Sequence, residues 1–215
     1  MLDECAKGRH VIPLFAALGD TIHRRSLSLT PFHDLIAAFK QDLVIDRYED
    51  WEALNDYCRL SANPVGRLVL AVCGQSNEQY FAYSDKICTA LQLTNHWQDV
   101  SEDFGRGRIY IPQEILRKFN ITESDIEANI PTASFKQMML YLCDYSEQLF
   151  LEGKPLIDLV GKPLAPQLYL YYGGGNAALN AIRRAGGDVM SKRCRVGNAD
   201  RFKLVIGALA KWLGF

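Results

Sequence analysis

The sequence predicts an all-α fold formed by one domain that spans residues 1–215. Apolar residues recur three and four positions apart in one segment after another, which is the period of a helix that buries one face. No alternating run of apolar and polar residues is long enough to predict a β-strand. The chain has 215 residues, of which 48% are hydrophobic, so it can bury a substantial core.

The first helices are predicted over residues 13–25 and 29–43, where apolar residues follow helical spacing. In the second of these, Thr30 suits the N-cap and Pro31 suits the first helical position. Both segments are therefore expected to pack one apolar face against the core.

Two longer helices are predicted next. The first covers residues 48–74, and Pro64 is expected to interrupt it because proline removes a backbone hydrogen bond. The second covers residues 78–107 as one continuous helix, ended by Gly105 and Gly107. An irregular stretch should follow at residues 108–121. Further helices are predicted from Thr122 onward and over residues 134–157, 165–189 and 198–215.

Composition excludes several classes of protein. The net charge is -1 and no basic stripe with interleaved aromatic residues is present, so nucleic acid is not an expected partner. No apolar run reaches the roughly 18 residues of a membrane-spanning helix. The chain is thus predicted to be cytoplasmic, or peripheral to the inner membrane. The cysteines form no CxxC pair and are expected to be reduced thiols: Cys5, Cys58, Cys73, Cys88, Cys143 and Cys194.

Oxygen-bearing side chains line one face of the predicted helix over 78–107. Asn95, Asp99 and Asp103 follow one another at intervals of four residues and drift by only about 80° around the helix axis. Gln92 lies one turn upstream on the same side, and Glu102 is close to the same line. Stacked acids repel unless a cation is present, and hard oxygen ligands suit Mg²⁺.

An ordinary solvated acidic face is the competing interpretation. The remaining faces of the helix are strongly apolar, which favours a central position in the fold and therefore a site; the apolar residues are Leu91, Leu93, Trp97 and Val100. Arg106 and Arg108 follow directly, and guanidinium groups suit diphosphate oxygens.

Other conspicuous residues have ordinary explanations. The histidines form no pair at metal-binding spacing, so His96 is expected at the surface or a helix end. The three glycines 173–175 lack the GK[ST] sequence of a phosphate-binding loop and are expected to break their helix. The apolar stripe of Val205, Leu209, Trp212 and Phe215 is typical of a core-facing helix, with contact to a membrane surface as the alternative.

The segment ALQLTNHWQDVSEDFGRGRIYIP resembles the second aspartate-rich signature of the squalene/phytoene synthase family, QxxNxxxDxxEDxxxGRxYxP. Every fixed position is filled, by Gln92, Asn95, Asp99, Glu102, Asp103, Gly107, Arg108, Tyr110 and Pro112. The segment YCRLSANPVGRLVL is similar to the YxxxxAxxVG helix of the family, with Tyr57, Ala62, Val65 and Gly66 matching. Its Asn63-Pro64 variant resembles the bacterial hydroxysqualene synthases of the hopanoid pathway. Residues 181–197 also resemble the closing helix and basic turn of the family.

The resemblance implies an isoprenoid-synthase fold, a helical bundle around a central cavity, with Mg²⁺ held between two acidic helices. The first acidic motif, of DxxxD type, is expected upstream of His10 but is absent, and Asp3 with Glu4 does not replace it. The chain is therefore expected to be truncated at its N-terminus relative to the family and to lack the first helices.

The resemblance also implies roles for individual residues. Asn95, Asp99 and Asp103 would hold the metal, and Gln92, Arg108 and Tyr110 would contact diphosphate. Tyr57 would face the reacting carbons, with Asp99 and Asp103 also counted as catalytic. The small residues Ala62, Val65 and Gly66 would leave room for prenyl chains.

The implied activity is that of a head-to-head isoprenoid synthase. Its substrate would be farnesyl or presqualene diphosphate, with presqualene diphosphate converted to hydroxysqualene as the favoured reaction. No GxGxxG sequence follows a strand, so no NADPH is expected. Three alternatives stay open: a phytoene or dehydrosqualene synthase, a non-catalytic family member that acts in assembly or binding, and an inactive fragment of an active protein.

Overall fold

The structure is a computed structural model that describes residues 2–9, 12–191 and 193–213. Its helices confirm the predicted all-α class. They are α1 (Leu2–Ala6), α2 (Pro13–Arg25), α3 (Thr30–Gln41), α4 (Trp51–Ser61), α5 (Asn63–Val72), α6 (Glu78–Gln98), α7 (Val100–Gly105), α8 (Gln113–Lys118), α9 (Glu123–Glu127), α10 (Ala133–Gly153), α11 (Leu156–Leu159), α12 (Ala165–Arg184) and α13 (Asn198–Leu213).

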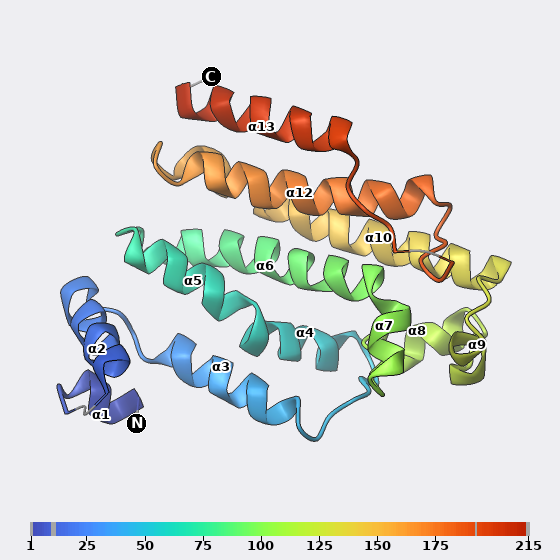
Figure 1. Cartoon of the computed structure of the whole chain (residues 1–215), viewed down its shortest axis with the longest axis horizontal. Helices are drawn as coiled ribbons and strands as arrows, with labels where there is room; N and C mark the ends of the chain where they lie inside the picture. The colour runs from blue at the N-terminus through green and yellow to red at the C-terminus, as the bar shows by residue number, and fades with distance from the viewer. Residues whose placement is uncertain (1, 10–11, 192, 214–215) are drawn as a thin grey trace.

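The helices lie in successive layers around α6 (Figure 1). Helices α6 and α10 run side by side at the centre, and α12 packs against both. On the other side of α6 lie α5 and α4, which are covered in turn by α3. Helix α13 is outermost and packs on α12, while α1 and α2 pair at the N-terminal end. Helix α6 therefore lies at the centre of the fold, with other helices packed around it.

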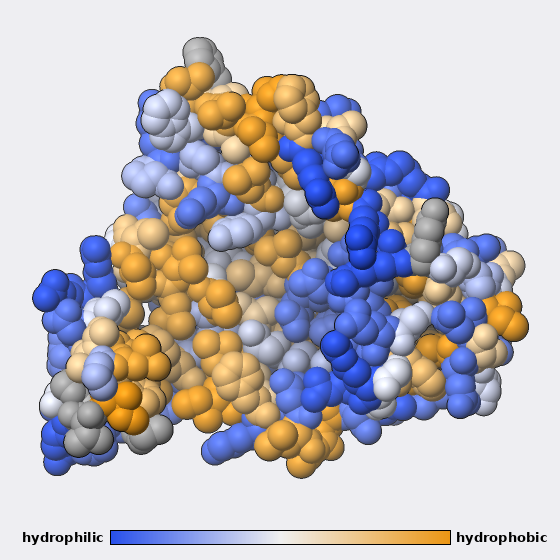
Figure 2. Space-filling model, in the orientation of Figure 1, coloured by the Kyte–Doolittle hydropathy of each residue, from blue (hydrophilic) through white to orange (hydrophobic). Residues whose placement is uncertain are grey.

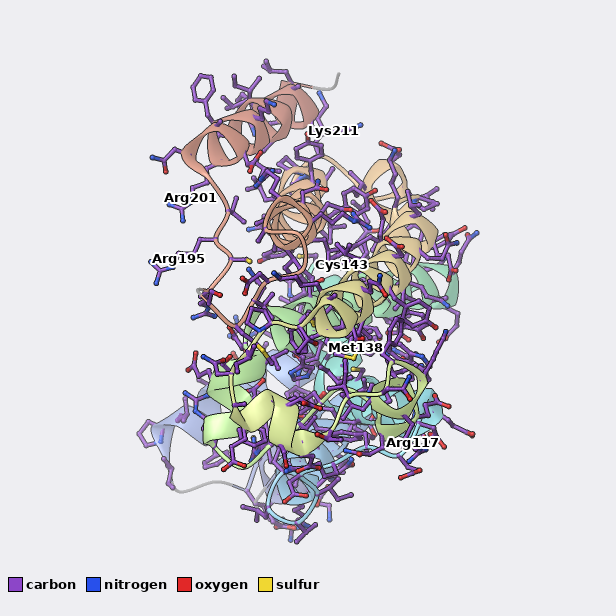
Figure 3. All side chains as sticks on the ribbon, turned by 90° about the vertical axis from the view of Figure 1, so that its right-hand side faces the viewer. Arg117, Met138, Cys143, Arg195, Arg201 and Lys211 are labelled. Atoms are coloured by element: carbon purple, nitrogen blue, oxygen red, sulfur yellow. The ribbon has the colours of Figure 1, made fainter. Side chains whose placement is uncertain are left out.

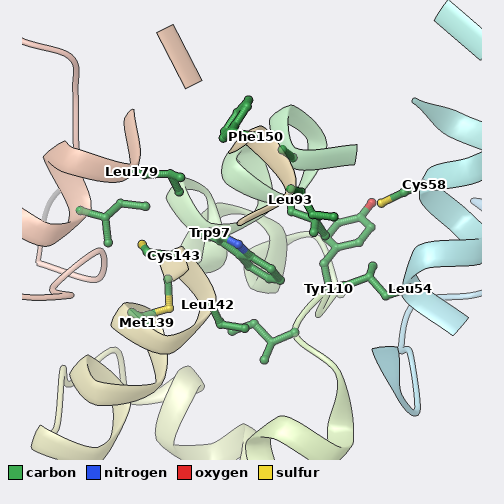
Figure 4. Close-up of a cluster of buried hydrophobic side chains, with 14 of the residues drawn as sticks. Leu54, Cys58, Leu93, Trp97, Tyr110, Met139, Leu142, Cys143, Phe150 and Leu179 are labelled. Atoms are coloured by element: carbon green, nitrogen blue, oxygen red, sulfur yellow. The ribbon is translucent and has the colours of Figure 1, made fainter. Parts of the chain in front are cut away.

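The core is centred on Trp97 of α6, which is completely buried (Figure 4). Its indole N–H donates a 2.8 Å hydrogen bond to Ser146 Oγ of α10, so the one polar atom of the ring is satisfied inside the core. Around it lie apolar side chains from both halves of the chain, among them Leu54, Leu93, Met139, Leu142, Phe150 and Leu179. This packing confirms that the helix with the acidic motif is central.

The predicted interruption of the helix over 48–74 is confirmed. Helix α4 ends at Ser61, Ala62 has φ -111° and ψ -48°, and α5 begins at Asn63 with Pro64 in its first turn. Proline is tolerated there because the first backbone N–H groups of a helix have no partner within it. The amide oxygen of buried Asn63 accepts a 2.9 Å hydrogen bond from Thr89 of α6, which fixes the break against the central helix.

Other helix predictions were wrong in detail. The stretch over 108–121 is not irregular throughout, since α8 forms at Gln113–Lys118, and the helix over 134–157 divides into α10 and α11. The helix over 78–107 is not continuous, because Asp99 has φ -109° and ψ 16° and separates α6 from α7. The glycines 173–175 do not break their helix, since α12 runs through them from Ala165 to Arg184. A side chain at Gly175 would collide with the Phe150 ring, so this glycine serves close packing of α12 on α10.

The cysteines are free thiols, as predicted. No described helix combines the length and the apolar character that crossing a bilayer requires. The described residues contain no β-strand, and an isolated bridge joins Arg47 to Ile109.

Candidate active site

The acidic residues lie where α6 passes into α7. Asp99 forms the break, yet its N–H still bonds to the Asn95 carbonyl at 3.0 Å, and the Asp103 N–H bonds to the Asp99 carbonyl at 2.8 Å. The helical register therefore continues through the break. Asn95 is exposed, whereas the side chains of Asp99 and Asp103 are only 22% and 15% exposed. Glu102 is more open, at 48%.

Arg193, from the loop after α12, closes over this acidic end. Its guanidinium donates to Asp99 Oδ2 at 2.9 Å and lies 3.9 Å from Glu102. Burial raises the pKa of the Asp99 carboxyl, and the charge of Arg193 opposes that shift. Asp99 Oδ1 also lies 2.8 Å from Arg193 Nη2, so both carboxylate oxygens are paired with the same guanidinium. A metal ion at Asp99 would therefore have to displace Arg193 or share the carboxylate with it.

His96 is buried beside the acids, which corrects the expectation of a surface or helix-end residue. Gln92 Nε2 lies 3.2 Å from His96 Nε2, and an amide nitrogen can only donate, so His96 Nε2 accepts. This contact suits the tautomer of neutral His96 that carries its proton on Nδ1, which faces Asp103 Oδ2 at 3.8 Å, beyond hydrogen-bond distance. Burial lowers the pKa of His96 and favours this neutral form. His96 thus links Gln92 to Asp103.

An aromatic cluster borders the acids. The rings of His96 and Tyr110 are stacked with centroids 3.6 Å apart, and Tyr57 lies 5.9 Å from Tyr110. Tyr48 stacks on the other side, 5.3 Å from Tyr57 and 5.8 Å from Tyr110. Burial raises the pKa of the Tyr57 and Tyr48 phenols, which therefore stay neutral. These rings are at most 9% exposed and their faces pack against one another and against His96, so a cation would reach an electron-rich face only if this packing opened.

Arg108 is held at the edge of this cluster. Its guanidinium donates to the Asp42 carbonyl at 2.8 Å and to the Tyr110 hydroxyl at 3.3 Å. The loop that carries Arg108 and Tyr110 is fixed by the Ile109 N–H, which bonds to the Asp46 carbonyl at 3.0 Å. The conformation of this loop depends on a segment of the same chain that is more than 60 residues away in sequence, so no local sequence pattern could have predicted it.

An apolar groove of about 290 Å³ lies farther along α6. Val65 and Gly66 of α5 line it together with Ser84 and Cys88 of α6, and Leu168 and Tyr171 of α12 close the third side. Val65 is half exposed toward this groove. Ala62 is buried at the α4–α5 break and does not line the groove, so its predicted role in leaving room for a chain stays a prediction.

The groove and the acidic end lie on one line of α6. Cys88, Gln92, Asn95 and Asp99 follow at helical spacing, so a rise of about 16 Å separates the first from the last. Figure 2 shows the same division on the hollowed face, with apolar surface on the side of α5 and hydrophilic surface on the side of α7. The site is therefore amphipathic: it is suited to a molecule with an apolar tail and a charged head.

The acidic residues fit one half of a magnesium site. Mg²⁺ takes one or two protein carboxylates and completes its octahedron with waters and phosphate oxygens. The carboxylates of Asp99 and Asp103, which are 22% and 15% exposed, and the nearby amide of Asn95 supply ligands of this kind. Within the described ranges, no group of three or more His, Cys, Asp or Glu side chains is arranged to hold a metal by itself. Substrate oxygens would therefore have to complete the coordination.

Sequence reasoning missed three residues of this site: His96, Arg193 and Tyr48. The basic segment around Arg193 was noticed, but its ion pair joins positions 94 residues apart in sequence. Tyr48 lies in the α3–α4 loop, where no periodicity distinguishes it.

Comparison with known proteins gives matches along most of the chain. A family model described as squalene/phytoene synthase matches residues 2–200. Hydroxysqualene synthase from Zymomonas mobilis subsp. mobilis is 43% identical over 117 residues, which are 53% of this chain and 39% of that protein. Phytoene synthase from Arthrospira platensis is 31% identical over 212 residues, which are 91% of this chain and 67% of that protein.

A solved structure agrees with these matches. Squalene synthase HpnC from Alicyclobacillus acidocaldarius superposes with a TM-score of 0.84 at 43% identity, over 86% of this chain and 70% of that chain. The chain spans less than half the length of the curated hydroxysqualene synthases that it matches.

Proposed function

Because the chain belongs to the squalene/phytoene synthase family, we propose that it acts in the Mg²⁺-dependent ionisation of a prenyl diphosphate. Conversion of presqualene diphosphate to hydroxysqualene is the favoured reaction, since hydroxysqualene synthases are among the relatives of highest identity. The all-α isoprenoid-synthase fold of the family is the fold of this chain.

The proposal is supported by the position of the apolar groove and of the acidic residues along the same side of α6, with the groove near Cys88 and the acids just after the end of the helix. A prenyl diphosphate has the same polarity, with a hydrocarbon chain at one end and a dense anionic group at the other. Asn95, Asp99 and Asp103 are the residues that would hold Mg²⁺. When bound, the metal would neutralise the charge that develops on the leaving diphosphate.

The other residues of the site supply binding, orientation and shelter. Arg108 and Arg193 stand at the acidic end and would contact diphosphate oxygens, for which guanidinium groups are well shaped. In this proposal His96 orients the Asp103 carboxylate through its Nδ1–H, in the way that outer residues orient metal ligands. Gln92 fixes the tautomer of His96.

The reaction breaks the bond between carbon and diphosphate oxygen, and the electron pair leaves with the diphosphate. The resulting allylic or cyclopropylcarbinyl cation would lie against the rings of Tyr57 and Tyr110, which are neutral and closely packed. Water then attacks the rearranged cation and loses a proton, which gives an alcohol. No reductant is consumed along this route, so no NADPH is expected.

Two other functions are favoured by specific observations. Phytoene synthases also match over most of the chain, so a polyene product is the alternative within the family. A non-catalytic binding role is the alternative outside it, since no three His, Cys, Asp or Glu side chains among the described residues are grouped to hold a metal.

Product analysis separates these functions. The chain would be incubated with Mg²⁺ and either farnesyl or presqualene diphosphate, and the products extracted and identified by mass. We expect a C30 alcohol from presqualene diphosphate and a loss of about a hundredfold or more in turnover for Asp99→Asn. Asp20→Asn, an exposed acid on α2, is the matched control and should keep wild-type turnover.

The alternatives have distinct outcomes in the same experiment. A C40 or C30 polyene would move the assignment to a phytoene or dehydrosqualene synthase. Saturable binding of presqualene diphosphate without any product would support the binding role. Equal turnover in wild type and Asp99→Asn would remove Asp99 from the mechanism.

A further inference from the structure

Helix α13 is the outermost helix of the fold, and its outer face is apolar. Its inner side packs on α12, where Leu204 contacts Gly173 and Gly207 lies against Tyr169. The opposite side is open to solvent over an arc of about 120°. Its members are more than half exposed, and they are Phe202, Val205, Ile206, Leu209, Trp212 and Leu213.

This open side corrects the expectation that the C-terminal stripe faces the core. Val205, Leu209 and Trp212 are exposed by 55%, 55% and 63%, and Phe215 lies outside the described residues. Six exposed apolar side chains along one side of a single helix form the kind of patch that marks an interaction surface.

The apolar surface continues from α13 toward the candidate active site. Pro166 and Leu170 of α12 form a shallow groove of about 420 Å³ with Val205, Leu209 and Trp212. Tyr171, next to Leu170 in sequence, is 51% exposed and lines the groove of the active site. The two grooves therefore lie on neighbouring sides of α12, one toward α13 and one toward α6.

Positive charges flank this surface. Arg195, Arg201 and Lys203 are exposed, and none of the three forms an ion pair with another described residue. Arg195 and Arg201 project to the same side of the molecule (Figure 3). The acid of α13, Asp200, is already paired with Arg184 at 2.8 Å. The edges of the apolar stripe therefore carry positive charges that form no ion pair with another described residue.

From this pattern we infer that the outer face of α13 docks on an anionic lipid bilayer, with the helix lying in the plane of the interface. Apolar residues on one side of a helix and basic residues along its edges are the features of helices that bind in this way. A second copy of the chain fits less well, because a symmetric interface pairs this surface with itself, and the acid of α13, Asp200, is already paired with Arg184 and leaves Arg201 and Lys203 without an anionic partner. The apolar and basic residues of this surface lie on α13 and beside it, and their docking on a bilayer does not depend on the proposed catalysis.

Vesicle sedimentation of the whole chain tests the inference. We expect the chain to sediment with vesicles of phosphatidylcholine mixed with phosphatidylglycerol, and much less with phosphatidylcholine alone. Each basic residue near an anionic surface contributes about fivefold to the partition constant, so Arg201→Gln with Lys203→Gln should weaken binding about thirtyfold. Added salt should reduce the remaining difference between the two vesicle types.

A second pair of variants tests the apolar side. Phe202→Ser with Leu209→Ser should lower binding at least tenfold. The matched control is Leu43→Ser with Val44→Ser, since these side chains are 82% and 80% exposed but lie in the α3–α4 loop. Circular dichroism would verify that each variant keeps its helical content.

Three outcomes would overturn the inference: a wild-type chain that stays in the supernatant, a Phe202/Leu209 variant that binds as well as wild type, or a control pair that loses binding equally. If the wild-type chain instead forms a dimer that the Phe202/Leu209 variant cannot form, and vesicles do not compete with that dimer, the face is a contact between copies rather than a lipid-binding surface.

Discussion

Gly66 offers a quantitative test of how α5 meets α6 at the apolar groove. A Cβ atom at this position would lie 2.5 Å from Cys88 Sγ and closer still to Ser84 Oγ, both on α6. Ser84 is buried, and Cys88 lines the groove beside Gly66. Two side-chain atoms would therefore have to move before alanine could fit at position 66.

The expected magnitude combines two opposing effects. Overpacking of this kind costs about 2–3 kcal/mol when two neighbours are displaced. Alanine is better than glycine within a helix by about 1 kcal/mol. Gly66→Ala should therefore lower the free energy of unfolding by about 1–2 kcal/mol, which corresponds to a fall in Tm of roughly 2–8 °C for a chain of this size.

The sign of the effect should reverse when the obstruction is removed. In a background of Ser84→Ala with Cys88→Ala both obstructing atoms are gone, so Gly66→Ala should stabilise by up to about 1 kcal/mol. Urea unfolding of the four proteins gives the coupling free energy directly. Gly174→Ala in α12 is the matched control, because no atom lies within 4 Å of its added Cβ, and it should stabilise in either background.

The reasoning would be refuted if Gly66→Ala behaved like Gly174→Ala in the wild-type background. It would also fail if the effect of Gly66→Ala had the same sign in both backgrounds, because the close approach of α5 and α6 would then not be the cause.

Three further outcomes are expected. Hydrogen bonding to Arg47 lowers the pKa of Glu123 from its ordinary 4.5. The wild-type chain should therefore have a higher free energy of unfolding than Glu123→Gln above pH 4.5, and this difference should vanish as the pH falls through the lowered pKa. Because the ion pair is exposed, we expect a difference of about 0.5 kcal/mol, measured by urea unfolding at neutral and acidic pH. Cys73 is exposed while burial raises the pKa of Cys58 to about 12, so Cys73→Ser should remove the fast phase of thiol labelling of the native chain. Gly187 has φ 81° and faces a backbone carbonyl of α10, so Gly187→Ala should cost more than about 1 kcal/mol, seen as a fall in Tm.

Much of the candidate site could be predicted because its residues are close in sequence. Asn95, Asp99 and Asp103 lie within two helical turns, so spacing alone places them on one side of the chain. The interruption near Pro64 was equally predictable, because proline has no backbone N–H to continue the hydrogen bonds of the helix that contains it.

Other features depended on contacts between distant segments. The glycines 173–175 have low helix propensity, yet α12 continues through them because Phe150 of α10 fills the space that a side chain at Gly175 would occupy. The burial of His96 follows from the stacking of Tyr110 against its ring, and Tyr110 is held there by the loop between α3 and α4.

The amino-acid sequence by itself determined the all-α class, most of the longer helices and the four-residue spacing of Asn95, Asp99 and Asp103, because these follow from the period and capping of single helices. Only the tertiary structure decided that Arg193 pairs with Asp99, that His96 is buried beside Asp103, and that the outer face of α13 remains open. The physical reason is range: helix periodicity acts over a few residues, whereas burial and ion pairing depend on which segments meet after the chain has folded.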